Sequence, residues 1–230
     1  MRRLLFRTHI WLGWLVGGQL LLWTLSGLVM TAMPIGEVRG EHLRARPAPS
    51  PVAGLDGLLP PEAFLTRAGP EADSLVLRQL AGRPVWELRE GHEAVALFDA
   101  RTGTPIRLDA RAIAALARAA HAGAAAVSQV SRVPEGAPPL EFRRGSPAWA
   151  VRFDDDEGST FYLHAVSGEL LAVRTDRWRL FDLMWGLHIM DWRGREDFNH
   201  PLLVGAAAAA SAGVFGGLLL LLLRLRWRRA

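Results

Sequence analysis

Three histidines lie at the ends of two long apolar segments, where side chains can hold a cofactor in a membrane. His9 precedes the first apolar segment, and His188 and His200 precede the second. A b-type haem takes axial ligands on opposite sides of its ring, and both are often histidine. We therefore take His9, His188 and His200 as candidate ligands of a haem b, the one cofactor that the sequence suggests.

The distance between these histidines limits how they could share a haem. A helix rises about 1.5 Å per residue, so a membrane-spanning segment separates His9 from the other two by about 30 Å. Within one chain, His188 and His200 could bind one haem together; alternatively, His9 could pair with His9 of a second chain. A third interpretation requires no cofactor, because histidine side chains also anchor helix ends at a membrane interface.

No other group of residues has the spacing of a catalytic or metal site. The acidic run 154–157 lacks the spaced carboxylates and distal glutamate of a calcium loop, so we expect a solvated hairpin tip there. The remaining histidines have no histidine or carboxylate at ligand spacing, and we expect ordinary surface or core residues. They are His42, His92, His121 and His164. Because nucleophile and phosphate-loop motifs are also missing, we expect no metal site and no catalytic activity on this chain alone.

The charges of the chain are unevenly distributed. The 230 residues have a net charge of +4, 50% hydrophobic residues and no cysteine. Seven arginines lie before the first apolar segment or after the second and give the chain ends a charge of +7. The segment between the two apolar segments has 20 arginines and 23 acidic residues, for a charge of −3. The basic character therefore belongs to the chain ends, and we expect no nucleic-acid partner. Without cysteine, disulfides and cysteine-ligated zinc or iron–sulfur sites are excluded.

Both apolar segments, 10–33 and 201–223, are long enough for transmembrane helices, which need roughly 20 residues. Arginines flank both at their outer ends, so the positive-inside rule predicts cytoplasmic chain ends and a central segment across the membrane. A cleaved signal peptide is the alternative for the first segment, but its apolar run is too long. Glycines at the spacing of close helix packing favour contact between the spans or a homodimer. They are Gly13 with Gly17 and Gly213 with Gly217.

The central segment contains a weak internal duplication. Trp86 recurs 63 residues later as Trp149, and Gly103 recurs 65 residues later as Gly168. Alternating apolar and polar residues predict a hairpin in each copy, preceded by a helix and a third strand, with Asp109 as the cap of the second helix. The predicted helices are 61–68 and 109–122, and the predicted strands are 74–80, 83–88, 94–98, 127–133, 146–151 and 160–163.

A further helix is predicted just before the second apolar segment. Trp178, Phe181, Trp185, His188 and Trp192 are three or four residues apart. This spacing places them on one helical face. Such a helix would lie on the outer membrane surface or against the spans, or it would cover the small β core.

The first apolar segment, with His-Ile-Trp-Leu-Gly at 9–13 and Thr-Leu-Ser-Gly at 24–27, resembles the first span of PepSY-associated transmembrane proteins. The duplicated units resemble PepSY domains, which combine a tryptophan-containing strand, an aromatic partner strand and an Asp-x-x-Thr-Gly turn. Residues 99–103 fit this turn, whereas the second copy has His164 and Ser167 in place of Asp and Thr. Residues 187–191 also resemble this group.

The resemblance implies a short, two-span form of this family in the bacterial inner membrane. The expected fold is an α+β membrane protein in which two transmembrane helices flank a periplasmic α+β insert of two PepSY-like repeats. The expected division of the chain is a cytoplasmic basic tail 1–9, transmembrane helix 10–33, linker 34–57, repeat 58–108, repeat 109–176, amphipathic interfacial helix and connection 177–200, transmembrane helix 201–223 and cytoplasmic basic tail 224–230.

The same resemblance suggests two functions. Larger relatives with four or more spans are associated with iron–siderophore uptake and ferric reduction through haem held by membrane histidines, which implies an accessory in iron uptake or haem-linked electron transfer. PepSY modules elsewhere are linked to peptidase propeptides, so the alternative is a membrane-tethered periplasmic module that binds or inhibits a protein partner such as a peptidase. The expected partners are the lipid bilayer and a second copy or another membrane or periplasmic protein.

Overall fold

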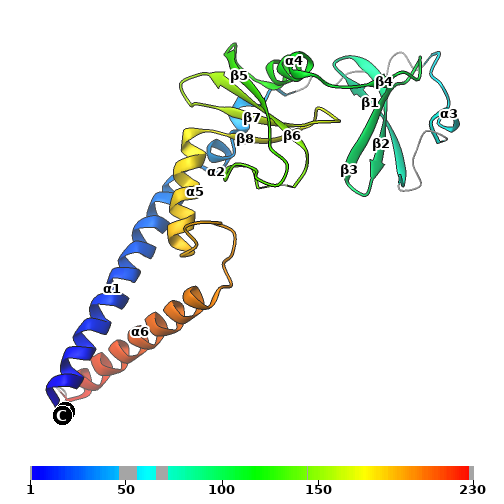
Figure 1. Cartoon of the computed structure of the whole chain (residues 1–230). Helices are drawn as coiled ribbons and strands as arrows, with labels where there is room; N and C mark the ends of the chain where they lie inside the picture. The colour runs from blue at the N-terminus through cyan, green and yellow to red at the C-terminus, as the bar shows by residue number, and fades with distance from the viewer. Residues whose placement is uncertain (1, 47–55, 66–71, 144, 228–230) are drawn as a thin grey trace. The chain divides into compact units, whose positions relative to one another are not determined.

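The computed structural model describes all residues except 1, 47–55, 66–71, 144 and 228–230 (Figure 1). The chain forms two compact units, which we describe separately. One comprises Met1–Pro34 together with Arg179–Ala230, and the other comprises Ile35–Trp178. Helix α5 (Asp176–His188) begins in the second unit and ends in the first. The fold is therefore α+β, with the long apolar helices and the β-sheets in different units.

The first unit contains two long apolar helices, α1 (Arg2–Ala32) and α6 (Pro201–Trp227), which contact one another. Gly13–Ala32 and Pro201–Leu218 are long and apolar enough to cross a membrane. Large apolar side chains of both helices are exposed, among them Trp14 at 75% and Phe215 at 73%. A helix satisfies its own backbone hydrogen bonds, so this arrangement is suited to a hydrocarbon environment.

The first sheet of the other unit has four antiparallel strands in chain order. They are β1 (Ser74–Leu80), β2 (Arg83–Glu90), β3 (Glu93–Asp99) and β4 (Pro105–Ile106). Trp86 is paired with Phe98 across β2 and β3. The short helix α3 (Glu62–Leu65) places Phe64 on this sheet, with its ring centroid 5.6 Å from that of Phe98. Phe64 is 1% exposed, so this one aromatic side chain supplies much of the core of the first repeat.

The second sheet repeats the arrangement with a longer helix. Its strands, again antiparallel and in chain order, are β5 (Ala126–Arg132), β6 (Ala148–Asp154), β7 (Thr160–His164) and β8 (Leu170–Arg174). Helix α4 (Ala110–Ala120) packs Ile113 and Ala117 against Val151 and Phe161, and all four side chains are fully buried. Asp109 caps the helix as predicted, because its carboxylate accepts the Ala112 amide at 2.8 Å.

The two sheets share the features on which the predicted duplication depends. Gly103 and Gly168 follow β3 and β7 with φ of +69° and +70°, a conformation that favours glycine. Each of these turns leads into a fourth strand, β4 or β8, that the sequence pattern had not indicated. The predicted helix 61–68 is observed only as α3, and the remainder of its range lies mainly outside the described residues.

The predicted linker 34–57 begins with ordered structure. Its first residues form α2 (Ile35–Val38) and the 3-10 helix η1 (Glu41–Leu43), and its residues 47–55 lie outside the described residues. The Ala45 amide donates to the Ala120 carbonyl at 2.8 Å, and the Ala122 amide donates to the Leu43 carbonyl at 2.8 Å. The start of the linker is thereby attached to the end of α4.

Helix α5 is shorter than the aromatic spacing predicted. It ends at His188, and Met190 follows with a φ of +58° that stops the helix. Trp192 therefore lies beyond the helix, 62% exposed, and does not continue its aromatic face. The prediction was wrong at this end because regular spacing of side chains cannot reveal a left-handed backbone residue.

Candidate functional site

A cavity of about 950 Å³ lies in the Ile35–Trp178 unit, between the first sheet and helix α4. This volume is within the range of about 300–1,000 Å³ that is typical of ligand pockets. Aliphatic side chains from both repeats line it, namely Leu80, Val85, Ile106, Leu108, Leu116 and Leu170. Residues of both repeats are therefore needed to form this cavity, which we call the groove.

Helix α4 builds one wall of this groove because it is apolar around most of its circumference. Ile113 and Ala117 cover the second sheet, whereas Ala115, Leu116 and Ala119 line the groove. Ala115 and Ala119 are exposed there. An amphipathic helix normally has one apolar face, so a second uncovered apolar face indicates a surface available for binding.

The groove is positively charged. Its lining includes the side chains of Arg44, Arg46, Arg83 and Arg107 and a single acidic residue, Asp99, for a net charge of +3. All four arginines are exposed, and no ion pair is recorded for them within the described part of the chain. The electrostatic character of the groove therefore favours an anion.

The one acidic residue is committed to the turn after β3. The Asp99 carboxylate accepts the backbone amides of Arg101 and Thr102, each at 2.9 Å. The Thr102 amide, followed by that of Arg101, holds the pKa of Asp99 below its ordinary value. The ionised Asp99 carboxylate is thus already hydrogen-bonded within the turn. These hydrogen bonds explain why an Asp suits the first position of the Asp-x-x-Thr-Gly sequence.

Polar side chains connect the two repeats beside the groove. Glu93 of the first sheet accepts from His164 at 2.9 Å and from the Ser146 hydroxyl at 2.5 Å. Arg78 donates to Glu87 at 2.5 Å and also to the carbonyl of Ser167. The contacts of Glu93 with His164 and Ser146, and of Arg78 with the Ser167 carbonyl, cross from one repeat to the other and hold the two walls of the groove together.

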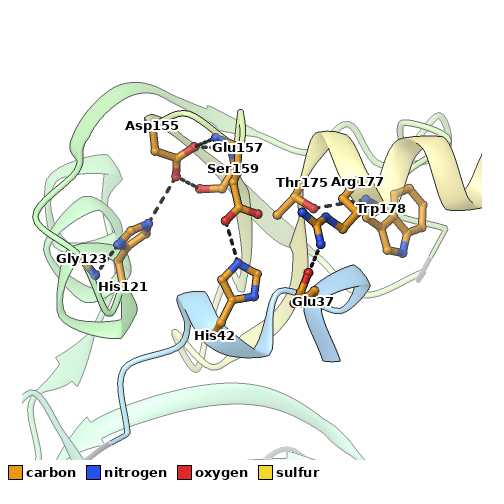
Figure 2. Close-up of polar contacts among 10 residues, drawn as sticks. All are labelled: Glu37, His42, His121, Gly123, Asp155, Glu157, Ser159, Thr175, Arg177 and Trp178. Atoms are coloured by element: carbon orange, nitrogen blue, oxygen red, sulfur yellow. Dashed lines mark hydrogen bonds and ion pairs between the residues drawn. The ribbon is translucent and has the colours of Figure 1, made fainter. Parts of the chain in front are cut away.

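Polar contacts attach the segment before the first sheet to the turn between β6 and β7 and to the start of α5 (Figure 2). His42 is 2.7 Å from Glu157, and Arg177 is paired with Glu37. His121 Nε2 lies 3.4 Å from Asp155, while its Nδ1 accepts the Gly123 amide at 2.9 Å. Because Nδ1 accepts this hydrogen bond, Nε2 carries the ring hydrogen and donates a hydrogen bond to the carboxylate.

These contacts correct one expectation. The acidic run was expected to be solvated, and this is wrong for Asp155, whose side chain is only 14% exposed. Burial opposes ionisation of Asp155, but hydrogen bonds from the Ser159 hydroxyl and amide, His121 and the Glu157 amide outweigh it and lower the pKa. Three of the four remaining histidines contact a carboxylate from a distant part of the sequence. They are His42, His121 and His164.

The candidate haem ligands lie in or beside the helices of the other unit. His9 belongs to α1, and its side chain lies outside the described ones. His188 Nδ1 is 3.0 Å from Ser26 Oγ of the same unit. At about 1.5 Å rise per residue, His9 and Ser26 are about 26 Å apart along α1. His9 and His188 of one chain are therefore too far apart to share a haem.

The contacts of His188 accommodate a tautomer that could bind a metal. Ser26 Oγ lies 2.7 Å from the Leu22 carbonyl and 3.0 Å from His188 Nδ1, and when its hydroxyl donates to that carbonyl it accepts from Nδ1. The His188 carbonyl accepts the Trp23 indole N–H at 2.7 Å. In that arrangement Nδ1 carries the proton, and Nε2 has the free lone pair that a metal ligand requires.

His200 is held differently, because both of its ring nitrogens have partners. Nε2 donates to the Ile189 carbonyl at 2.9 Å, and Nδ1 accepts the Leu203 amide at 3.3 Å. His200 thus caps the start of α6. A haem shared by His188 and His200 would require His200 to give up one of these bonds.

The connection between α5 and α6 is ordered by its carboxylates. Asp182 is 5% exposed and forms an ion pair with Arg195 at 2.7 Å. Asp191 accepts the amides of Gly194, Glu196 and Asp197. The Glu196 amide, then the Gly194 amide, lowers the pKa of Asp191 to about 2. The carboxylate in the 187–191 sequence therefore shapes this loop.

The groove was not predicted from the sequence. Its arginines were counted only as part of the central charge, and residues 34–57 were predicted to be a linker. One local signal was available, the apolar residues around most of α4 apart from Arg111 and Arg118. The other wall could not be foreseen, because it depends on how the two repeats pack.

Comparison of the chain with protein-family models, with curated protein sequences and with solved structures gave no significant match. Within the described residues, no three His, Asp or Glu side chains come together as they would in a metal site. The described residues thus form a groove whose two walls are joined by hydrogen bonds between the repeats. In the other unit, His188 has a ring nitrogen, Nε2, that could bind a metal.

Proposed function

We propose that this chain is a membrane-tethered binding module of the bacterial inner membrane, with both chain ends in the cytoplasm and residues 35–178 in the periplasm. The observation that carries the proposal is the positively charged groove of about 950 Å³, formed by both repeats of the sheet-containing unit. The module would hold a ligand without transforming it and would act as an accessory to another membrane or periplasmic protein.

The family proposal rests on the repeated sheets. Both have four antiparallel strands in chain order, and both have a positive-φ glycine after the third strand. These features support a short, two-span member of the PepSY-associated transmembrane group. The membrane placement rests on the two apolar helices and on the seven arginines outside the apolar segments.

Photo-crosslinking in cells tests the binding function. A photoreactive benzoylphenylalanine at Thr104, on the rim of the groove, should form a light-dependent adduct that is detected in the mass of the intact protein. The additional substitution Ala115→Trp, which fills the groove from exposed α4, should reduce the yield at least several-fold. The control is the same photoreactive residue at Arg152, which is exposed on β6 and outside the groove. An equal yield at both positions, unaffected by Ala115→Trp, would contradict the proposal.

Haem-linked electron transfer is the second candidate, and the contacts of His188 favour it. When the Ser26 hydroxyl donates to the Leu22 carbonyl, His188 Nδ1 carries the proton and Nε2 is able to coordinate iron. A bound haem would supply one-electron redox chemistry. The second axial ligand would come from His188 of another chain or from His200 after its release from the Ile189 carbonyl.

A visible spectrum tests this candidate. The purified chain, expressed with added haem precursor, should show a Soret band that is lost in His188→Ala. The Soret band should be weaker in Ser26→Ala, because that change removes the hydrogen bond that orients the His188 ring. His92→Ala, which changes an exposed histidine of the sheet-containing unit, is the control. Absence of the band in the unaltered chain would exclude haem as its cofactor.

A further inference from the structure

We propose that the groove binds the free carboxylate form of a long-chain fatty acid, with the aliphatic chain along α4 and the carboxylate among the groove arginines. This inference rests on the proposed binding function and names its ligand class. Two observations carry it: the purely aliphatic character of the apolar lining and the excess of unpaired positive charge around it.

The apolar part of the groove fits a methylene chain. Its lining side chains are leucine, isoleucine, valine and alanine, and no aromatic side chain is among them. Neighbouring aromatic residues point into the repeat cores instead, as the burial of Phe64 and Phe98 at 1% and 7% exposure indicates. Each methylene removed from water by these walls adds to the free energy of binding. A chain of a dozen or more methylenes would therefore gain most of its affinity on these walls.

The charged part of the groove fits a single anionic group. Arg44, Arg46, Arg83 and Arg107 lie around it, and the carboxylate of Asp99 is already bound to two turn amides. A guanidinium group can donate two parallel hydrogen bonds to a carboxylate. An incoming carboxylate would thus meet arginines that have no described carboxylate partner, and no existing ion pair would need to be broken.

A peptide ligand is less well matched to these walls. The edge strands β1, β4 and β8 each contribute a single residue to the lining, and Pro105 of β4 has no amide hydrogen to donate. The only uncharged polar side chain of the lining is Thr104, and its hydroxyl is bonded to that of Thr102 at 2.8 Å. An extended peptide would therefore leave most of its backbone groups unpaired.

Labelling with a photoactivatable palmitate tests this inference. The probe carries a diazirine in its chain and is added to the full-length protein in nanodiscs of a zwitterionic lipid. Labelling should be saturable and should map to the peptides that contain residues 80–85, 104–108 and 112–120. Unlabelled palmitate should compete, whereas its methyl ester, which has the same chain without the charge, should compete at least about tenfold less well.

Paired variants separate the two features of the groove. Ala115→Trp should reduce groove labelling at least tenfold, whereas Ala110→Trp, at an exposed position of α4 outside the groove, should not. The double change Arg44→Glu with Arg107→Glu should weaken palmitate binding about tenfold or more. Arg118→Glu reverses a charge on α4 outside the lining and is the matched control. Circular dichroism of each variant verifies that the sheets are retained.

Three results would overturn the inference. They are labelling confined to α1 and α6, equal competition by the acid and its methyl ester, and labelling unaffected by Ala115→Trp. If the Thr104 photo-crosslink still captures a ligand in cells while palmitate fails to label the groove, the binding function stands and the fatty-acid inference falls. If both experiments fail, the binding function falls as well.

Discussion

Charged residues that are buried in the sheets are held by charged partners. Glu87 is the clearest case, because its side chain is 1% exposed and lies between the guanidinium groups of Arg78 and Arg89. A buried charge is stable only when it is paired and hydrogen-bonded. Arg78 also donates to the Ser167 carbonyl, so one side chain both neutralises the carboxylate and connects the repeats.

The substitution Arg78→Ala should lower the free energy of unfolding by about 3 kcal/mol, because it leaves the buried Glu87 carboxylate with one partner. Chemical denaturation of the full-length protein, followed by circular dichroism of the sheets, measures this loss. Arg152→Ala, at an exposed arginine of β6, should change the same free energy by less than about 0.5 kcal/mol. A similar effect of both substitutions would show that the Glu87 pair contributes little.

Asp155 should give the second sheet a measurable dependence on pH. Asp155→Asn replaces one acceptor oxygen by an amide and should cost about 1–2 kcal/mol at pH 7. The folded pKa of Asp155 is below its ordinary value of 3.8, so its contribution is complete above that value and is lost as pH falls below it. The difference between the unaltered chain and the variant should therefore shrink below about pH 4.

Denaturation midpoints of both chains at pH 7, 5 and 3 measure this convergence. Asp156→Asn is the matched control, since Asp156 is exposed on the same turn. A difference between the unaltered chain and Asp155→Asn that grows towards pH 3 would contradict the assigned role of Asp155.

At the scale of secondary-structure elements, the short helices before the first sheet are positioned by one glycine. Gly40 separates α2 from η1 with a φ of +64°, and a Cβ atom there would lie 2.5 Å from Val173 Cγ1 on β8. Two separate physical effects therefore require glycine, the left-handed backbone and the close approach to the second sheet.

Comparison with a second glycine separates these two effects. Gly82→Ala should cost about 1 kcal/mol, because Gly82 has a φ of +77° but open space around its Cβ position. Gly40→Ala should cost about 1–3 kcal/mol more, since overpacking against Val173 is added. Denaturation of the two variants measures the difference. Equal costs would show that the chain moves away from β8 without penalty.

At the scale of the whole molecule, the absence of cysteine makes the proposed membrane topology directly measurable. Single changes Arg7→Cys and Arg152→Cys place one thiol near the first chain end and one on β6. In intact cells with a permeabilised outer membrane, an impermeant maleimide should label the second thiol and not the first. Both should react after lysis. Labelling of Arg7→Cys in intact cells would reverse the proposed orientation.

Much of the local structure follows from sequence pattern. The strands predicted at 74–80 and 127–133 are observed as β1, which has the same bounds, and as β5, shifted by one residue. Asp109 caps α4, and the glycines of the turns after β3 and β7 have positive φ. These features depend on neighbouring residues, on the period of apolar side chains and on the few residues that allow a given backbone conformation.

The sequence by itself therefore determined the two apolar helices, the duplicated β units and the charge difference between the ends and the centre. Only the tertiary structure decided which charged groups meet: His164 pairs with Glu93 across 71 residues, and His42 pairs with Glu157 across 115. The groove and the tautomer of His188 likewise depend on residues from separate segments. Local pattern encodes the period and ends of an element, whereas such contacts are decided only when the packed elements bring distant side chains within hydrogen-bonding distance.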